Sequence, residues 1–433
     1  MIMWSKTGKS SQMRVIPLLL VATLTACGPA PKPEHTGDTA TPPTDSGETG
    51  TDTSGPEDTA DTGDTASKTV DFSDIDTLIE GYLKTAPIPG LGAALTVGGE
   101  VIWADGYGWA DIENKIPATG DTAFMLASVS KTFVATALMQ RIEEGAFELD
   151  TPVNDLLDFT LDNPHLKDEV VTVRHVASHT ASLCDAWVWG SPGSPGGLYS
   201  EGDSEISLRD FLMGYLIDGG EWYGDMNFCN REVGTHYEYS NIGADLAGYL
   251  LESSGTSPLD DHSDAYIFEP LGMENTGWHL ADHDVSNVAV PYDYMGGEYI
   301  PYEKYGYPDY PCGQLRSSAY DLARYLAAYA NGGTLGDEQI LQTDSIDEMF
   351  ALQAPGVEMT QGVFWYWSVI GDRDVVGHSG GDYGVSTEIV LDPATGVGVV
   401  LLFNTYGNAA VWSAHAAIQE ALFVKGESIA KGD

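Results

Sequence analysis

A stretch without core-forming side chains separates the first 27 residues of the chain from the rest. Residues 28–67 contain no aromatic residue and no Val, Ile, Leu or Met, and the pattern TGDTA occurs in them twice. A segment of this composition cannot bury enough apolar surface to offset the entropy lost on ordering. We therefore expect a disordered acidic tether here, followed by one folded domain over residues 68–425 and a short tail over 426–433.

Residues 1–27 have the layout of an export signal. Three basic residues precede an apolar run over 15–24, and small residues then lead to Cys27. An apolar run of this length is typical of a secretory signal and is too short to span a bilayer comfortably. The ending Leu-Thr-Ala-Cys resembles a bacterial lipobox, which would make Cys27 the lipidated first residue; the alternative is cleavage near Ala26 with an unmodified cysteine. Either way we expect the domain to work outside the cytoplasm, in the bacterial cell envelope.

The net charge of −46 limits the partners of the chain. Nucleic acid and anionic membrane surfaces repel such a field, so we expect no nucleic acid partner and membrane contact through the lipid anchor alone. A strongly acidic surface is more typical of solubility in a salty environment than of a binding site.

Three further cysteines, Cys184, Cys229 and Cys312, lie in the expected domain. Their spacing matches no metal motif, and an exported compartment permits disulfides. We favour a Cys184–Cys229 disulfide, because both residues lie in irregular stretches that flank candidate catalytic segments. Cys312 is then left over.

Strand-like sequence at both ends of the domain encloses a more helical middle. Helix-like periodicity over 70–86 is followed by two β-rich runs on either side of Gly98-Gly99, a hairpin signal. The end of the chain returns to β-rich sequence before a helix expected over 410–423. Further helices are expected over 129–145 and 321–333. We predict one α+β domain whose sheet is completed by the C-terminus, with a cleft where the helical part meets the sheet.

The stretch LASVSKTF, residues 126–133, holds two serines and a lysine at the start of an expected helix. Ser128 and Lys131 are three positions apart and share a helical face, whereas Ser130 points elsewhere. A serine hydroxyl needs a base, and a lysine can serve if burial or positive neighbours lower its pKa. We therefore favour Ser128 as the nucleophile and expect Ser130 to be structural.

Two later segments offer partners for Ser128. Tyr239 and Asn241 precede a helical pattern, where the tyrosine could relay a proton and the amide could hold a substrate carbonyl. Further on, His378 begins the run HSGG, whose small residues Ser379 and Gly381 leave a strand edge open to a substrate. His378 would supply a switchable positive or hydrogen-bonding group there.

These segments, in this order, resemble the serine β-lactamase and penicillin-binding-protein superfamily over about residues 70–425. The middle motif Tyr-Ser-Asn is similar to the class C branch and its relatives among esterases, D-aminopeptidases and D-Ala-D-Ala carboxypeptidases. The segments over 171–183 and 310–326 also resemble stretches of this family. The resemblance implies a β-lactamase/transpeptidase-like fold, in which an antiparallel sheet from the two ends of the domain carries an inserted helical subdomain.

The same resemblance implies roles for individual residues. Ser128 would be acylated, Lys131 and Tyr239 would share the proton transfers, and Asn241 would orient the substrate. The backbone N–H groups of Ser128 and Gly381 would form the oxyanion hole. We expect structural roles for two further residues of the matching segments, His179 and Arg316. No metal or cofactor is implied.

His378 stands where many relatives have lysine. A permanent charge suits the carboxylate of a penicillin, whereas histidine is mostly neutral at pH 7. The sequence therefore favours an exported serine hydrolase acting on esters or D-amino-acid amides, of esterase, D-aminopeptidase or D,D-carboxypeptidase type. The alternatives are a β-lactamase proper and, in another class, an inactive surface binding module. We expect residues 184–203 and 298–313 to form the walls that determine specificity.

Residues 377–381 also satisfy the pattern GxSxG, the nucleophile elbow of α/β-hydrolases, with Ser379 as the nucleophile. That motif requires a strand, a sharp turn and a helix, followed by an acid and a histidine. The sequence after Gly381 is β-rich, and Asp392 and His415 lie very close for such a triad. This alternative is the weaker one.

Overall fold

The computed structural model describes residues 70–186, 190–194, 196–255 and 257–432. The expected export signal, Cys27 and the acidic tether lie outside the described residues. None of the helices in the described part has both the length and the apolar content that a bilayer crossing requires.

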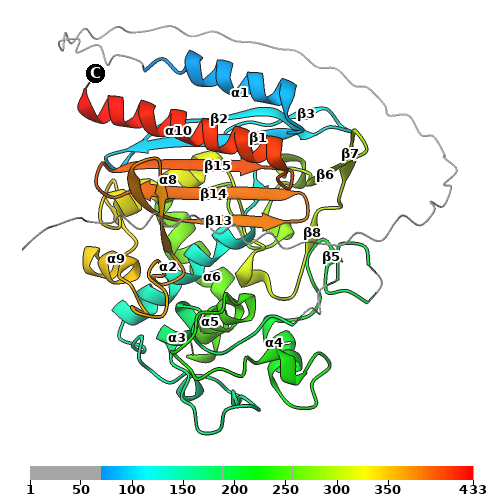
Figure 1. The fold of residues 1–433 in the computed structure, drawn as a ribbon, viewed down its shortest axis with the longest axis vertical. Coiled ribbons are helices and arrows are strands. Elements are labelled where there is room, and N and C mark those ends of the chain that lie inside the picture. The colour runs from blue at the N-terminus through cyan, green and yellow to red at the C-terminus, as the bar shows by residue number, and fades with distance from the viewer. Residues whose placement is uncertain (1–69, 187–189, 195, 256, 433) are drawn as a thin grey trace, which may run out of the picture. The chain divides into compact units, whose positions relative to one another are not determined.

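A seven-stranded antiparallel sheet forms the centre of the domain, and strands from both ends of the chain build it (Figure 1). Strand β1 from the N-terminal part pairs with β15 from the C-terminal part, with Leu91 opposite Phe403. This pairing confirms the predicted completion of the sheet by the C-terminus. In sheet order, the strands are β12 (Tyr366–Ile370), β13 (Arg373–Asp382), β14 (Val385–Asp392), β15 (Val397–Phe403), β1 (Gly90–Val97), β2 (Glu100–Asp111) and β3 (Ile116–Pro117).

The central strands are buried on both faces because each face packs against helices. Along β15, Val399 and Leu401 point to the face covered by α1 and α10, while Val400 and Leu402 point to the opposite face. This alternation is the period of two expected of a strand, here with apolar residues on both sides. Two hydrophobic cores therefore share one sheet.

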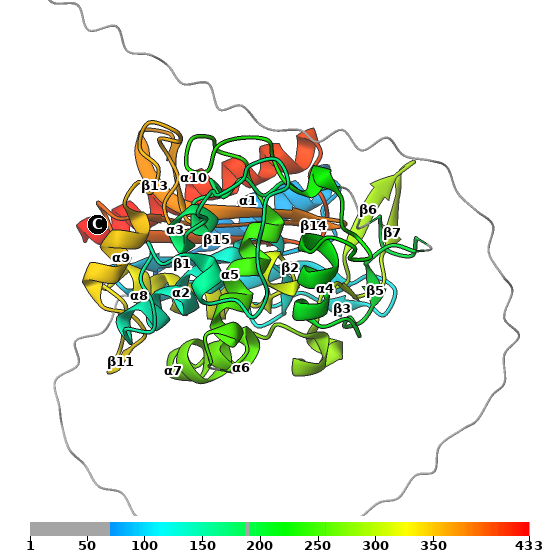
Figure 2. The ribbon, with the colours of Figure 1, turned by 90° about the horizontal axis from the view of Figure 1, so that it is seen from below.

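Helices α1 and α10 lie together over one face, and the remaining helices lie over the other (Figure 1). Seen from below in Figure 2, α3, α4 and α5 lie in front of the sheet. The helices are α1 (Ser73–Thr85), α2 (Ser130–Glu143), α3 (Val173–Ala177), α4 (Leu208–Leu216), α5 (Asn241–Ser253), α6 (Leu259–Ser263), α7 (Glu269–Leu271), α8 (Ala319–Ala330), α9 (Thr343–Phe350) and α10 (Ala409–Lys431).

Short paired strands lie outside the sheet, within the long connections of the helical part. They are β4 (Phe124–Met125) with β9 (Arg316–Ser317), β5 (Ser200–Glu201) with β8 (Tyr305–Gly306), β6 (Tyr292–Met295) with β7 (Glu298–Pro301), and β10 (Thr334–Leu335) with β11 (Glu338–Gln339). The first two pairs join segments far apart in the sequence, and the second of them, β5 with β8, brings both predicted wall segments to the same part of the molecule.

One predicted boundary is wrong. Helix α10 runs to Lys431, past the helix end predicted at 423 and into the expected tail over 426–433. Gly426 is buried in this helix, where a Cβ would lie 2.6 Å from the side chain of Val397. The glycine thus permits close packing of the helix on the sheet, and it does not end the helix.

Candidate active site

Ser128 lies in a 3-10 turn, Ala127–Val129, that leads directly into α2. Lys131 Nζ donates a hydrogen bond to Ser128 Oγ at 3.2 Å. Ser130 lies on another side of the helix, where its Oγ accepts the backbone N–H of Leu315 at 3.2 Å. The geometry thus distinguishes the two serines as the sequence predicted, and the nucleophile candidate is the one in contact with the lysine.

The backbone just before Ser128 is strained. Ala127 has a φ of 47°, a left-handed conformation that residues with a Cβ rarely adopt. Such strain costs on the order of 1–3 kcal/mol and occurs at functional sites more often than elsewhere. Here it accompanies the turn that presents Ser128 to the cavity described below.

Lys131 is completely buried, and its ammonium group uses all three protons. It donates to Ser128 Oγ, to Asn241 Oδ1 at 2.8 Å and to the backbone carbonyl of Cys312 at 2.6 Å. Burial lowers the pKa of Lys131, but Tyr239 and Cys312 beside it raise the pKa by more, so the net direction is upward. The condition under which Lys131 itself could serve as the base, a lowered pKa, is therefore not met, because the lysine is buried among groups that favour its charge.

Tyr239 lies against this lysine, with Lys131 Nζ 5.1 Å from the centroid of the tyrosine ring. The following residue, Ser240, is the N-cap of α5, so Asn241 is the first residue of the helix rather than its cap. His179 fixes this connection, because its Nδ1 accepts the backbone N–H of Ser240 at 3.1 Å and its ring lies 4.5 Å from that of Tyr239. Burial lowers the pKa of His179 well below its usual value, so it is a neutral, structural group.

Asp185 holds the start of α5 and was missed in the sequence analysis. Its carboxylate accepts the backbone N–H of Asn241 with both oxygens, at 3.0 and 2.8 Å, and the hydroxyl of Ser240 at 3.1 Å. A carboxylate at a helix N-terminus satisfies N–H groups that have no partner within the helix. Asp185 thereby fixes the backbone at Asn241, whose side-chain oxygen accepts the hydrogen bond from Lys131.

The disulfide between Cys184 and Cys229 confirms the predicted pairing, and Cys312 is free and buried. Two backbone hydrogen bonds flank the disulfide, from Cys184 N to Asn227 O and from Cys229 N to Ser182 O, both at 2.9 Å. The residue after Cys184 is Asp185. The crosslink therefore anchors the loop that supports the start of α5.

The edge of β13 is open beyond Gly377, because β12 ends opposite that residue at Tyr366. Ser379 N donates to the Tyr366 hydroxyl at 2.9 Å, which shows that the N–H of Ser379 points to this open edge. Alternate residues of a strand direct their N–H groups to the same edge, so the N–H of Gly381 also points there. Gly381 and Ser128 line the same cavity, as an oxyanion hole would require.

Gly380 allows β13 to approach the turn that carries Ser128. A Cβ at this position would lie 2.2 Å from the carbonyl oxygen of Leu126 and 3.1 Å from the backbone nitrogen of Ser128. No larger residue fits without moving the backbone. The glycine is thus required by close approach of two backbones rather than by its own φ.

His378 differs from the prediction. It is buried, its Nδ1 donates to the carbonyl of Ser379 at 2.6 Å, and its Nε2 has no hydrogen-bond partner. Burial and the neighbouring charge of Lys131 lower the pKa of His378 to about 3. The predicted switchable positive charge is therefore wrong, because the ring is neutral at physiological pH and does not line the cavity.

A cavity of about 210 Å³ opens beside Ser128. Both wall segments predicted from the sequence contribute to it: Asp185 and Tyr199 come from 184–203, and four residues come from 298–313. Its lining residues are Ala127, Ser128, Asp185, Tyr199, Asn241, Tyr307, Asp309, Cys312, Gly313, Gly381 and Asp382.

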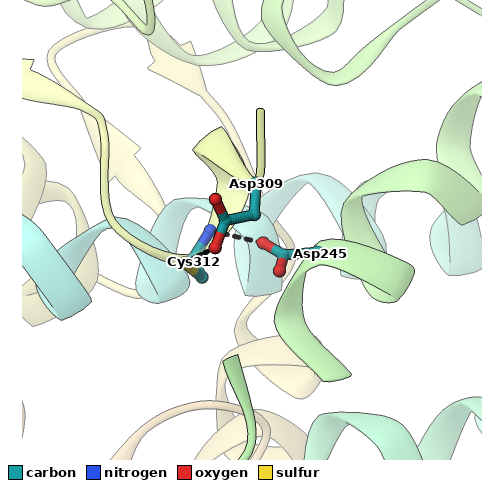
Figure 3. A group of neighbouring side chains, drawn as sticks. All are labelled: Asp245, Asp309 and Cys312. Atoms are coloured by element: carbon teal, nitrogen blue, oxygen red, sulfur yellow. Dashed lines mark hydrogen bonds between the residues drawn. The ribbon is translucent and has the colours of Figure 1, made fainter. Parts of the chain in front are cut away.

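Asp245, Asp309 and Cys312 form a buried group whose polar atoms lie within 4.8 Å of one another (Figure 3), and the last two of these residues also line the cavity. Cys312 N donates to Asp245 Oδ1 at 3.0 Å, and Cys312 Sγ lies 3.5 Å from Asp309 Oδ2. Burial raises the pKa of Asp245 and of the Cys312 thiol well above their usual values. A metal ion would need these groups deprotonated beside the Lys131 ammonium, whereas burial favours the protonated forms of Asp245 and Cys312, so the group does not fit a metal site.

The alternative GxSxG site is not formed. Residues 377–381 lie within the continuous strand β13, which turns into β14 and not into a helix. The histidine and the acid of that alternative have other partners. His415 Nε2 lies 3.2 Å from Glu388 Oε2, and Asp392 Oδ1 accepts the backbone N–H of Ala394 in a turn. The strand, turn and helix that a nucleophile elbow requires are therefore missing at Ser379.

The family of the chain follows from comparison with known proteins. The family model described as Beta-lactamase matches residues 75–422, which is most of the chain. The chain therefore belongs to the Beta-lactamase family, and its sheet and helices have the β-lactamase/transpeptidase-like fold, as predicted.

Individual relatives are distant. The protein named flp of Staphylococcus aureus is 24% identical over 333 residues, which is 76% of this chain and 62% of that protein. An octameric penicillin-binding protein homologue from Pyrococcus abyssi has a TM-score of 0.64 at 23% identity, over 83% of this chain and 79% of that one. The D-amino acid amidase of Ochrobactrum anthropi has a TM-score of 0.62 at 24% identity, over 81% and 99%. The chain thus spans about three fifths of its Staphylococcus relative, and the structural likenesses show the fold alone.

Proposed function

We propose that this protein is a serine hydrolase that cleaves an ester or amide bond through an acyl-enzyme on Ser128. The observation that carries the proposal is the hydrogen bond from the buried Lys131 ammonium to Ser128 Oγ, at 3.2 Å, within a cavity that also contains Asn241 and Gly381. A nucleophile, a proton-handling pair and an outward-pointing N–H at a strand edge are the parts that acyl transfer needs.

Tyr239 and Lys131 divide the proton transfer between them. We assign the positive charge to Lys131, because its upward pKa keeps it charged, and the role of proton acceptor to the side-chain oxygen of Tyr239. Ser128 Oγ bonds to the carbonyl carbon as its proton passes to Tyr239. The carbonyl oxygen becomes negative and binds to the N–H groups of Ser128 and Gly381.

The tetrahedral intermediate then collapses. The bond to the leaving alcohol or amine breaks, and that group takes the proton from Tyr239. A water molecule repeats the sequence on the acyl-enzyme: its proton goes to Tyr239, its oxygen bonds to the carbonyl carbon, and Ser128 recovers its proton as it leaves. Asn241, fixed by Asp185, holds the carbonyl side of the substrate beside Lys131.

Covalent labelling tests this proposal. The whole protein is treated with a fluorophosphonate, and the adduct is located by mass spectrometry. We expect modification of Ser128, loss of labelling in Ser128→Ala, and labelling retained in Ser130→Ala and Ser379→Ala. An adduct on Ser379, or labelling that survives Ser128→Ala, would reject Ser128 as the nucleophile.

Two alternative functions are a β-lactamase proper and an inactive binding module. A β-lactamase proper would need a group that accepts the substrate carboxylate, and the buried neutral His378 does not offer one to the cavity. An inactive binding module would give no adduct with either a fluorophosphonate or a fluorescent penicillin. The labelling experiment with both probes therefore separates the three.

We also propose that the protein is exported and lipid-anchored through Cys27. The disulfide between Cys184 and Cys229 supports export, because such bonds persist in oxidising compartments outside the cytoplasm. Metabolic labelling with a fatty acid analogue should mark the wild-type protein and not Cys27→Ser. Equal labelling of the two would reject anchoring at this residue.

A further inference from the structure

We propose that Asp382 is a positioning residue for acyl transfer, which holds the two walls of the cavity against the end of β13, where Gly381 presents its N–H. Asp382 acts through the residues that it binds and does not react itself. The inference rests on the proposed acyl-enzyme function, and it identifies the contacts that keep the oxyanion strand and the cavity walls in register.

The end of β13 has little backbone support of its own. Strand β12 stops opposite Gly377, and beyond that point Gly381 and Asp382 pair with β14 alone in the described sheet. The turn into β14 follows at once. A strand end that is paired on one side and lies next to a turn opens locally at low cost. An N–H group that must meet a developing negative charge therefore needs support from elsewhere.

Asp382 supplies this support by binding the first predicted wall, residues 184–203. The hydroxyl of Tyr199, which lines the cavity, donates to Asp382 Oδ1 at 3.0 Å. The next residue of the turn, Tyr383, donates its backbone N–H to the same oxygen at 2.8 Å and its hydroxyl to the carbonyl of Gly190 at 3.3 Å. Two neighbouring residues at the end of β13 thus hold this wall.

The second predicted wall is attached at the same place. The hydroxyl of Tyr307 forms a hydrogen bond with the carboxyl group of Asp382, and the hydroxyl of Tyr305 donates to the carbonyl of Tyr383 at 2.8 Å. Both tyrosines are buried, and the ring of Tyr199 packs edge-on against theirs, with centroids 5.3 and 5.4 Å apart. Three rings and one carboxyl group therefore join both walls to a single strand.

Tyr307 extends the effect of Asp382 to the buried lysine. The Tyr307 hydroxyl lies so close to Gly313 that a Cβ on this glycine would not fit. Gly313 directly follows Cys312, whose carbonyl accepts a hydrogen bond from Lys131 Nζ at 2.6 Å. A shift of Tyr307 would therefore move one of the three acceptors that fix the lysine. Asp382 is thus connected both to the oxyanion strand and to the group that contacts the nucleophile.

The ionised form of Asp382 suits this role, because a carboxylate can accept hydrogen bonds with both oxygens. Burial raises the pKa of Asp382 to about 6, and hydrogen bonds from the surrounding tyrosines oppose the rise. The residue is therefore mostly ionised at pH 7.5 and mostly protonated at pH 5. Protonation turns one oxygen into a donor among groups that are themselves donors, and so loosens the attachment of the walls.

The other titratable groups around Asp382 are tyrosines and two further carboxyl groups. Burial raises the pKa of every one of these tyrosines, so they stay protonated between pH 5 and 7.5: Tyr199, Tyr305, Tyr307 and Tyr383. Asp185 and Asp309 line the same cavity, and Arg316 donates to the backbone carbonyl of Tyr305 at 2.5 Å. A variant at position 382 is therefore needed to isolate the titration of Asp382.

The first test measures fluorophosphonate labelling of Ser128 at pH 7.5. Asp382→Ala should lower the second-order rate constant by about tenfold or more, because the walls and the strand lose their common acceptor. Asp382→Asn should recover part of the rate, since its oxygen can still accept the Tyr199 hydroxyl and the Tyr383 N–H. Asp374→Asn, at an exposed aspartate of the same strand, is the control and should react at the wild-type rate.

The extent of labelling separates positioning from loss of folded protein. At completion each variant should carry one label per chain, so that a slower reaction reflects the geometry of the site. Labelling of Asp382→Ala at the wild-type rate would overturn the inference, as would a slower rate that is fully explained by a smaller fraction of reactive protein.

The pH dependence of labelling is the second test. The wild-type rate should rise from pH 5 to 7.5 with an inflection near pH 6, where Asp382 ionises, and this inflection should be absent from Asp382→Asn. A purely structural role would lower the rate of the variant without removing an inflection. The same inflection in both proteins would overturn the inference.

Two variants of the walls cover the case in which Asp382→Ala does not fold. Tyr199→Phe and Tyr307→Phe each remove one hydroxyl, and each should slow labelling about threefold in the wild type and less in Asp382→Asn. Wild-type rates in both would overturn the inference. If the wild type shows neither labelling of Ser128 nor hydrolysis of p-nitrophenyl acetate, the proposed function itself is rejected, and the inference is rejected with it.

Discussion

The carboxylate of Asp185 accepts the backbone N–H of Asn241 with both of its oxygens, at 3.0 and 2.8 Å. Asn241 Oδ1 in turn accepts a hydrogen bond from Lys131 at 2.8 Å. Because Asp185 directly follows Cys184, a series of contacts runs from the disulfide through the start of α5 to the buried lysine. The geometry of the candidate site thus depends on the loop that contains Cys184 and Asp185, which lies more than 50 residues after the nucleophile Ser128 in the sequence.

Replacing Asp185 with alanine should therefore impair both stability and reactivity. The variant leaves the first N–H groups of α5 without their acceptor, and we expect a loss of about 2 kcal/mol in the free energy of unfolding. Fluorophosphonate labelling of Ser128 should slow at least tenfold, because Asn241 is no longer held against Lys131. Urea unfolding and labelling kinetics measure the two effects. Asp225→Ala, at an exposed aspartate of a nearby loop, is the matched control, and equal behaviour of the two variants would contradict this account.

The disulfide should contribute to stability and to reactivity together. The double variant Cys184→Ser/Cys229→Ser removes a crosslink that spans 45 residues, and we expect a loss of about 4 kcal/mol in the free energy of unfolding. Labelling of Ser128 should also slow, since Asp185 loses its anchor. Treatment with a reductant should reproduce both effects in the wild type and change nothing further in the double variant. If reduction changes neither the stability nor the labelling rate of the wild-type protein, the surrounding hydrogen bonds alone hold the loop that carries Asp185.

Much of the fold could be predicted from the sequence, because local residue patterns determine where many of its strands and helices lie. The β-rich sequence at the end of the chain and the Gly98-Gly99 turn predict strands that the structure contains. The end of α10 was not accessible, because Gly426 is a helix-ending residue by local preference and only its packing against Val397 explains its place inside a helix.

The residues of the candidate site also fall into those that could be predicted from the sequence and those that could not. The pair Ser128 and Lys131 follows from helical spacing, and the family resemblance supplied Tyr239 and Asn241. Asp185 could not be found, since an aspartate in an irregular loop has no local pattern and its role depends on a helix that begins more than 50 residues later. The strongly lowered pKa of His378 could not be predicted either, because burial and the proximity of Lys131 are tertiary properties.

A lysine in place of His378 should not convert the site into one that accepts carboxylates. The side chain at this position is buried and faces Lys131, so His378→Lys places a second ammonium beside the first, without a partner. We expect a loss of about 3 kcal/mol or more in the free energy of unfolding, no gain in labelling by a fluorescent penicillin, and slower fluorophosphonate labelling. His378→Gln, which is neutral and similar in size, is the control and should lose much less stability. A lysine variant as stable as the glutamine variant would show that the side chain reaches solvent.

Acidification from pH 7.5 to 5 should change the stability of the domain in two opposite directions. The buried aspartates Asp321 and Asp382 should stabilise the folded state, whereas the buried neutral histidines His179, His262 and His378, whose pKa values are lowered by burial, should destabilise it. Burial raises the pKa of both Asp321 and Asp382 to about 6, while an aspartate in the unfolded chain keeps a pKa of about 4. At these two aspartates the folded state therefore binds more protons than the unfolded state between these pH values, and each of the two should add about 1 kcal/mol on acidification. Urea unfolding at constant ionic strength measures the change.

The high negative charge of the chain acts in the same direction as the two aspartates, because protonation relieves self-repulsion. Asp321→Asn isolates the contribution of Asp321. Asp321 lies near the start of α8, where its Oδ2 accepts the backbone N–H of Asn275 and the hydroxyl of Thr276, so an asparagine oxygen can take over the acceptor role without titrating. Between pH 7.5 and 5, we expect the free energy of unfolding of this variant to change by about 1 kcal/mol less favourably than that of the wild type. An identical pH dependence of the two proteins would mean that Asp321 is ionised with an ordinary pKa in the folded state.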